Sequence, residues 1–353
     1  MDIIPLIERI GEGPTAALFG LITGITFGIA AQRSRFCLRA ATVEFARGMM
    51  RDKIAVWLLT FSTAVIWVQA AQIFGFVDLS NARNLAVPGS WSGAIIGGLM
   101  FGAGMVLARG CSGRLLVLAA TGNLRSVVSG LIFAVVAQMS LTGWLALPRD
   151  WLAALSVTSG GRNMDLLGAF HLPKESGLII GLCVAIIALE LSRRQKIGAS
   201  RLIFASGVGF AAALGYGLTY TLSQSAFDPV QIESLTFTGP SANMLMFFLD
   251  RNSLLEFDIG LVPGVVLGSF LSALVGRELK FQGFEGPTPM RNAMVGAALM
   301  GFGGMLAGGC AIGAGVSGGA VFAGTAWLAL FCMWIGGMVT DIALGGRGQP
   351  AMV

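Results

Sequence analysis

The feature that most constrains this chain is a series of apolar runs, each close to the length of a membrane-spanning helix. Such a helix needs roughly 20 mostly apolar residues, and nine runs approach this length. They cover residues 15–31, 54–77, 91–108, 126–147, 176–192, 202–222, 259–276, 293–308 and 321–344. Only 12% of the 353 residues are charged, against about 25% in a soluble domain, and the mean hydropathy is +0.79. The sequence predicts an all-α integral membrane protein with about nine transmembrane helices and excludes a soluble enzyme.

Three further apolar pieces are too short to cross a membrane. They are Leu115–Ala120, Met244–Leu249 and the glycine-rich stretch 308–320, which runs directly into the last long run. Irregular backbone at membrane depth is tolerated only where it is buried in protein or lines a wet cavity. We therefore expect short re-entrant helices beside the nine spans.

The distribution of basic residues predicts the orientation in the membrane. Of the 23 Lys and Arg residues, 17 follow the odd-numbered runs, and the other six lie at the N-terminus or follow the even-numbered runs. Because cytoplasmic loops carry an excess of Lys and Arg, we expect the N-terminus outside and the C-terminus in the cytoplasm. This rule also accounts for the net charge of +5 without a nucleic-acid partner. The first fourteen residues lack the basic segment of a cleavable signal peptide.

An internal repeat links the third and eighth runs. Residues 97–111 (GGLMFGAGMVLARGC) align with residues 296–310 (GAALMGFGGMLAGGC) at a constant offset of 199, with seven of fifteen positions identical. An odd number of spans separates the copies, so they would insert in opposite orientations, as in many transporters. We expect one transmembrane transport domain over residues 1–353. It would hold inverted repeats at about 15–147 and 202–344, joined by a connecting helix at about 176–192.

Three of the five cysteines share a context that suggests chemistry. Cys37 lies in RSRFCLR, Cys111 in ARGCSG and Cys310 in GGCAIG, each where a long helix is expected to break. Free backbone N–H groups at such breaks attract anions. Cys183 and Cys332 lie within apolar runs, where we expect them only to pack.

Charged and small residues beside these cysteines favour an anion site. The arginines near the first two cysteines are Arg33, Arg35, Arg39, Arg109 and Arg114. From the flanking residues we select Arg35, Arg109, Gly110 and Gly309 as support for an anion beside the thiols. The sequence has no Cys-x-x-Cys pair or Cys/His cluster, so we expect no metal site and no cofactor.

Other charged residues invite structural interpretations. Glu44 and Arg47 could pair across one turn of a short helix after Cys37, and Asp341 is expected to reach the membrane interface near the end of the last run. Two series of glycines at four-residue spacing, at 20, 24 and 28 and at 260, 264 and 268, predict closely packed helix faces.

With its cysteines in RFC (Cys37), RGC (Cys111) and GGC (Cys310), its number of spans and its glycine-rich repeat, the chain resembles the YeeE/YedE family of bacterial inner-membrane proteins over nearly its whole length. The resemblance implies uptake of thiosulfate through a narrow constriction between re-entrant segments, with these three cysteines passing the substrate along. It also implies a separate partner on the cytoplasmic side, a small sulfur carrier protein of the TusA type.

The residues leave other functions open. The cargo could be another sulfur or selenium compound, and the chain could instead be a membrane thiol sulfurtransferase, a channel or a scaffold. An enzyme is disfavoured because the sequence has no paired resolving cysteine and no His near any cysteine. For transport, we expect neutral S–H groups to offer successive weak hydrogen bonds to a dianion, since several weak sites favour passage over trapping.

Overall fold

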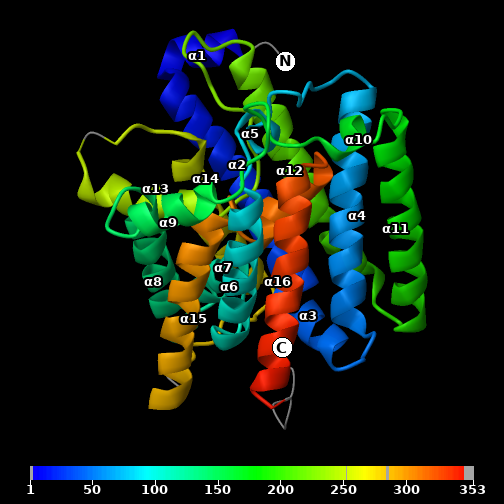
Figure 1. Cartoon of the computed structure of the whole chain (residues 1–353), viewed down its shortest axis with the longest axis vertical. Helices are drawn as coiled ribbons and strands as arrows, with labels where there is room; N and C mark the ends of the chain where they lie inside the picture. Colours follow the sequence, from blue (N-terminus) through cyan, green and yellow to red (C-terminus); the bar gives the residue numbers. More distant parts are fainter. Residues whose placement is uncertain (1–2, 252, 284–285, 346–353) are drawn as a thin grey trace.

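The computed structural model describes residues 3–251, 253–283 and 286–345, and the regular elements of these residues are helices. Within this part of the chain, eight segments are long and apolar enough to cross a membrane. They are Glu12–Ala46, Asp52–Ile73, Trp91–Ala120, Leu124–Leu141, Glu175–Arg194, Ala199–Ser223, Phe257–Val275 and Gly324–Ala343. The expected all-α membrane architecture is confirmed, with most helices running along the long axis of the molecule (Figure 1).

Two of these segments contain a break that separates a long helix from a short one. The first consists of α2 (Glu12–Ser34) and α3 (Leu38–Ala46), and the second of α6 (Trp91–Leu107) and α7 (Ser112–Ala120). The unbroken segments are α4 (Asp52–Ile73), α8 (Leu124–Leu141), α11 (Glu175–Arg194), α12 (Ala199–Ser223), α14 (Phe257–Val275) and α16 (Gly324–Ala343). Short helices beside the spans are thus confirmed.

The run expected at 293–308 forms α15 (Pro287–Leu306), which is as long as a span but less apolar than the eight segments. Its first turns contain two prolines, Thr288, Arg291 and Asn292, and its remainder is rich in Gly and Ala. Because α15 packs against α6 and α8, neighbouring helices cover much of the surface that a lipid-facing span would expose.

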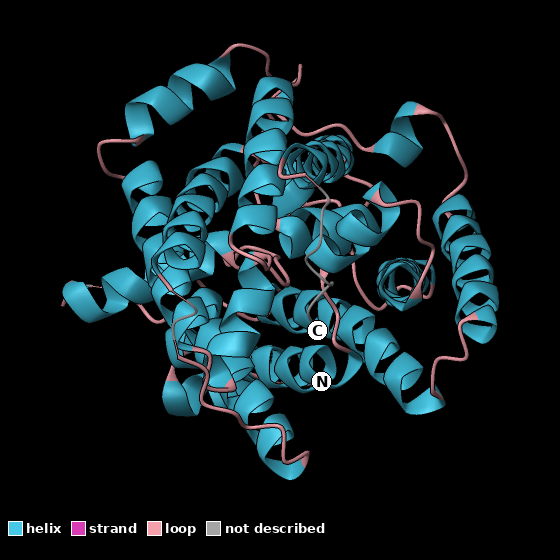
Figure 2. Cartoon of the chain, turned by 90° about the horizontal axis from the view of Figure 1, so that it is seen from below, coloured by secondary structure: helices cyan, strands magenta, loops and turns pink. Residues whose placement is uncertain are grey.

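Smaller elements complete the chain. They are α1 (Ile4–Ile10), α5 (Arg83–Ala86), α9 (Ala146–Ala154), α10 (Leu166–Ala169), α13 (Thr238–Leu249) and the π-helical turn η1 (Gly313–Gly318). We call the end of the molecule that carries α1 the α1 end and the opposite end, where α16 finishes, the C-terminal end (Figure 1). Seen along the long axis, helices surround a central region that also contains loop segments (Figure 2).

The helix contacts form matching sets in the two halves of the chain. α2 packs on α14 as α12 packs on α4, and α6 contacts α16 as α15 contacts α8. In the same way α3 contacts α16 and α13 contacts α8, while α11 covers α4. Apart from the contact of α11, each of these contacts therefore has a counterpart made by the helices at the matching positions of the other half.

Glycines allow the central helices to approach at backbone distance. A Cβ atom added at Gly303 would lie 2.7 Å from the carbonyl oxygen of Gly97, and one added at Gly296 would lie 2.6 Å from that of Gly104. Between α2 and α14, a Cβ atom at Gly264 would lie 3.0 Å from the Cα atom of Gly24. The glycine series of the sequence do form close-packed faces, as expected.

The expected pair of Glu44 and Arg47 does not form. Arg47 donates two hydrogen bonds of 3.0 Å to the carboxylate of Asp341, which is buried near the end of α16. Glu44 instead accepts from the backbone N–H groups of Lys53 at 3.1 Å and Ile54 at 3.3 Å. Glu44 and Arg47 have different partners because α3 packs against both α4 and α16. The spacing of residues within one helix does not indicate such packing.

Candidate functional site

Each of the three selected cysteines immediately precedes the start of a short helix. Cys37 precedes α3, Cys111 precedes α7, and Cys310 precedes the short helical segment 311–320 that contains η1. Cys111 and Cys310 are buried, and Cys37 is partly exposed. Since the first N–H groups of a helix have no partner within it, all three thiols lie beside backbone donors.

The same turn leads into each cysteine. Two residues before each cysteine the backbone is left-handed, at Arg35 (φ 55°), Arg109 (φ 58°) and Gly308 (φ 78°), a conformation that commonly ends a helix. The backbone N–H of Gly110 then donates to the carbonyl oxygen of Met105 at 3.0 Å. In the same way, the N–H of Gly309 donates to the carbonyl oxygen of Gly304 at 2.9 Å. Residues selected as support for an anion thus end the long helices and close these turns.

The structure brings Cys37 and Cys111 together, although they lie far apart in the sequence. Their side chains are close enough to act directly on each other, and neither forms a disulfide. The charges that act most directly on Cys37 are those of Arg114 and Arg39. The polar groups here are therefore two thiols and two guanidinium groups at the starts of α3 and α7.

Cys310 is the corresponding thiol of the second half. Its sulfur accepts from the backbone N–H of Phe237 at 3.3 Å and from that of Gly313 at 3.4 Å. Phe237 precedes α13 as Cys37 precedes α3, so an aromatic ring stands where the first half has a thiol. The ring of Phe237 packs against that of Phe27, with the centroids 5.1 Å apart.

The start of α7, directly after Cys111, also contacts the residue whose backbone bonds to Cys310. A Cβ atom added at Gly113, two residues after Cys111, would lie 3.2 Å from the ring of Phe237. The backbone N–H of Phe237 bonds in turn to Cys310. The break before α7 and the break before residues 311–320 therefore both contact Phe237.

The arginines divide into two kinds. Arg35 forms an ion pair of 3.5 Å with Glu278, and 46% of its side chain is exposed. By contrast, Arg39 Nε, Arg114 Nη1 and Ser112 Oγ are buried and have no hydrogen-bond partner among the described residues. The sequence shows the charge of Arg39 and Arg114, which were not selected as site residues. It does not show that these side chains are buried beside the thiols.

The two remaining cysteines differ from each other. Cys332 is buried on α16, as expected for packing, whereas Cys183 is exposed on α11. Because α11 lies at the edge of the helix bundle (Figure 1) and the Cys183 side chain is exposed, the expectation that Cys183 only packs is wrong. Neither residue lies near the breaks.

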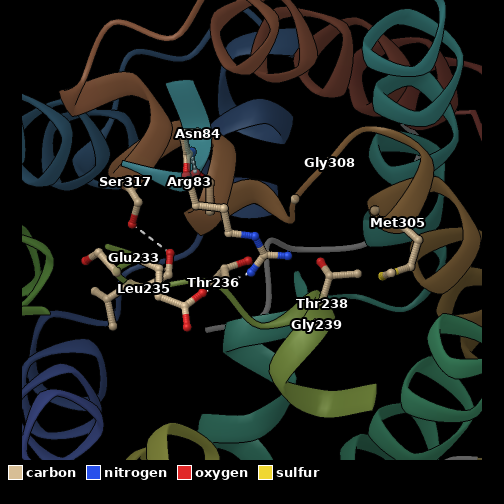
Figure 3. Close-up of a pocket in the computed structure, with 14 residues that line it drawn as sticks. Arg83, Asn84, Glu233, Leu235, Thr236, Thr238, Gly239, Met305, Gly308 and Ser317 are labelled. Carbon is tan, nitrogen blue, oxygen red and sulfur yellow. Dashed lines mark hydrogen bonds and ion pairs between the residues drawn. The ribbon is translucent and has the colours of Figure 1, made fainter. Parts of the chain in front are cut away.

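Beside Cys310 is a cavity of about 80 Å³, which we call the inner cavity (Figure 3). Its lining includes Gly309 and Gly313, which flank Cys310, together with Arg83 and Thr238. A wider cavity of about 480 Å³, the vestibule, shares Arg83 and Gly308 with it. Arg83 is the only basic residue between the second and third apolar runs, a signal that sequence reasoning left unused.

Comparisons with known proteins agree with this architecture. The sequence profile of the family described as Sulphur transport matches residues 33–339. The chain is 27% identical to the thiosulfate transporter TsuA of Escherichia coli K12, over 90% of this chain and 92% of that protein. It is 28% identical to the thiosulfate transporter TsuA of Spirochaeta thermophila, over 88% of this chain and 93% of that protein.

The matched region contains all three breaks and every one of the eight membrane-spanning segments, at least in part. The relatives are similar to this chain over nearly their full length, so the likeness covers the whole helix bundle rather than one motif. The chain is therefore a multi-pass membrane protein that belongs to the sulphur transport family, the YeeE/YedE family.

Proposed function

We propose that this protein imports thiosulfate across the bacterial inner membrane for sulfur assimilation, along a path formed by the vestibule, the inner cavity, Cys310, Cys111 and Cys37. The observation that carries the proposal is the convergence of three thiols, each at a helix start, at one buried meeting point of the two halves. Two relatives, both thiosulfate transporters named TsuA, agree with this cargo.

The two halves act as inverted repeats in this proposal, at about 15–147 and 202–344, with α11 as the connecting helix. The matched helix contacts and the reciprocal glycine contacts of α6 and α15 support that division. With the α1 end outside and the C-terminal end in the cytoplasm, as the basic residues favour, thiosulfate would meet Cys310 first and Cys37 last.

Carrying a dianion through a low-dielectric region is costly unless donors replace its water. Backbone N–H groups at the helix starts and the S–H groups of the thiols can provide such donors in succession. A thiolate would repel the dianion, so the proposed path requires neutral thiols. Arg39 and Arg114, with buried nitrogen atoms that have no partner among the described residues, would hold the oxygen atoms of thiosulfate while Cys37 and Cys111 contact its terminal sulfur.

At the C-terminal end, Cys37 and the arginines around it would deliver the cargo to a separate sulfur carrier protein of the TusA type. This partner follows from the family resemblance alone. A stable complex of the purified chain with such a carrier, formed only when thiosulfate is supplied, would support the assignment.

Uptake provides the direct test. Radiolabelled thiosulfate should accumulate in cells that lack their own uptake system when the wild-type chain is expressed, and such cells should grow on thiosulfate as sole sulfur source. Sulfate and selenite serve as competing cargo. No thiosulfate uptake from a well-expressed chain would overturn the proposal, and uptake of another of these anions instead would change the cargo but not the path.

The contact between Cys37 and Cys111 favours one alternative, a sulfurtransferase. A Cys37 thiolate would attack the terminal sulfur of thiosulfate, forming a persulfide and releasing sulfite as the S–S bond of thiosulfate breaks. Intact-mass measurement after incubation with thiosulfate distinguishes the functions, because a persulfide adds one sulfur atom to the chain. An unchanged mass during active uptake would exclude this alternative.

A further inference from the structure

Arg83 and Glu233 form an ion pair that lies between two different cavities. Arg83 Nη1 is 3.0 Å from Glu233 Oε2, and both residues line the inner cavity (Figure 3). Arg83 also lines the vestibule. Glu233 also lines a separate cavity of about 730 Å³ between the starts of α2 and α14 and the end of α12. The pair therefore contacts one cavity through its cation and another through its carboxylate.

The two large cavities differ in charge. Arg83 and Arg149 line the vestibule, where Asp150 pairs with Arg149. The cavity on the other side, which we call the acidic cavity, contains Glu233 together with the residues Glu12, Asp228 and Glu256. No Lys or Arg is among the described residues that line it. An anion is thus favoured in the vestibule, and a proton is favoured in the acidic cavity.

Beyond Arg83, the inner cavity has a second group suited to an oxyanion. Thr238, the first residue of α13, is only 2% exposed, and its hydroxyl has no hydrogen-bond partner among the described residues. In Figure 3 the guanidinium of Arg83 lies between Glu233 and Thr238. A Cβ atom added at Gly239 would lie 3.9 Å from Arg83 Nη2, so the cation is close to the start of α13, where backbone N–H groups are free.

We propose that Arg83 and Thr238 form the first binding site for a sulfur oxyanion at the α1 end, and that a proton reaching Glu233 through the acidic cavity releases Arg83 to hold the anion. This inference rests on the proposed transport of thiosulfate and adds a means by which capture depends on a proton. Neutralising Glu233 removes the carboxylate that competes with the anion for the guanidinium.

The groups around Glu233 determine the sign of the pH dependence. It faces Arg83 from α5, Tyr216 from α12, and Asp258 with the preceding Glu256 from α14. Burial raises the pKa of Glu233 above its ordinary value, Arg83 opposes this rise, and Glu256 adds to it. Protonation of Glu233 therefore begins at a higher pH than for a free Glu, and anion binding should strengthen as the pH falls through its pKa.

The test measures thiosulfate binding to the purified full chain by calorimetry between pH 5.5 and 8. One proton taken up with the anion gives at most a tenfold change in affinity per pH unit, and we expect the wild-type affinity to fall about tenfold across this range. Glu233→Gln should bind tightly at every pH, with a change of less than about twofold. Thr238→Val should weaken binding at all pH values and retain the pH dependence.

Glu190→Gln is the matched control, because Glu190 pairs with Arg194 on the exposed face of α11. It should reproduce the wild-type profile, and thermal unfolding of each variant verifies folding. A wild-type affinity that does not depend on pH, or the wild-type profile in Glu233→Gln, would overturn this inference while leaving transport intact. If Glu233→Gln does not fold, the Thr238→Val profile decides, since unchanged binding there excludes the site. Absence of thiosulfate binding at every pH would overturn both proposals.

Discussion

The thiol of Cys37 lies close enough to that of Cys111 for the two to act directly on each other, although the two residues belong to different breaks and precede different helices. Arg39 and Arg114 lie beside this pair and have buried nitrogen atoms that no described residue satisfies. Buried polar groups in folded proteins are nearly always hydrogen-bonded. In the proposed path, these unsatisfied donors would bind the oxygen atoms of the anion.

Replacing each of Cys37, Cys111 and Cys310 by Ala should lower thiosulfate uptake at least about tenfold. A hydrogen bond to a charged group is worth about 1.5–3 kcal/mol, and 1.4 kcal/mol corresponds to a factor of ten. Initial uptake rates of labelled thiosulfate in cells provide the measurement. Cys183→Ala and Cys332→Ala are the controls and should keep the wild-type rate, since neither thiol lies near the breaks.

Replacing the same three cysteines by Ser tests the part that sulfur itself contributes. Serine keeps a donor of similar size but removes the polarizable atom. We expect slower uptake and poorer selection of thiosulfate over sulfate, measured by competition. Serine variants that transport thiosulfate as fast and as selectively as the wild type would show that the polarizability of the cysteine sulfur atoms has no role in transport.

Arg114→Gln should raise the half-saturating concentration of thiosulfate about tenfold, because its charge acts on both thiols and charge-assisted bonds to anions are strong. Arg35→Gln removes the same charge from a half-exposed ion pair with Glu278, which is worth little. It should change that concentration less than about twofold. Equal effects of the two substitutions would indicate that the overall positive charge of the surface attracts the anion, instead of a local binding site.

Gly24→Ala should destabilise the folded chain by about 1–3 kcal/mol, the usual cost of overpacking a close contact. A Cβ atom there would lie 2.9 Å from the backbone nitrogen of Val265. Gly130→Ala on α8 is the matched control, because nothing lies within 4 Å of the added atom. Unfolding midpoints in detergent should fall only for the first variant, and similar midpoints would contradict the close packing of α2 on α14.

Asp341→Asn should also lower the unfolding midpoint, since it removes the carboxylate that accepts both hydrogen bonds from Arg47. The hydrogen bond to Asp341 raises the pKa of Arg47 above its ordinary value, so the guanidinium stays charged at any pH used for unfolding. In the double variant Arg47→Gln/Asp341→Asn, the second substitution should cost less than it does alone. Additive losses would show that the two side chains stabilise α3 and α16 independently.

Much of the fold follows from local sequence properties. Run length and hydropathy predict the long helices, and glycine spacing predicts close-packed faces such as those that hold Gly24 and Gly264. The three cysteine breaks were predictable because glycines and arginines interrupt otherwise apolar sequence at those places. In each of these cases the signal lies within a few residues of the feature that it predicts.

Features that depend on distant partners could not be predicted in this way. Nothing near Arg47 in the sequence indicates Asp341, and nothing near Arg83 indicates Glu233, because tertiary packing alone brings these pairs together. The buried positions of the Arg39 and Arg114 side chains could not be predicted for a related reason. They depend on which face of a short helix packs against the other half of the molecule.

Phe237 stands before α13 in the place that Cys37 occupies before α3, so the two sides of the meeting point have different chemistry. A path with unequal ends binds its cargo with unequal affinity from outside and from inside. A passive path must still give the same ratio of maximal rate to half-saturating concentration in both directions when no gradient is present. Phe237, which stands where a fourth cysteine would, can therefore change the half-saturating concentration of the path on each side. Only an external driving force can determine the direction of net flow.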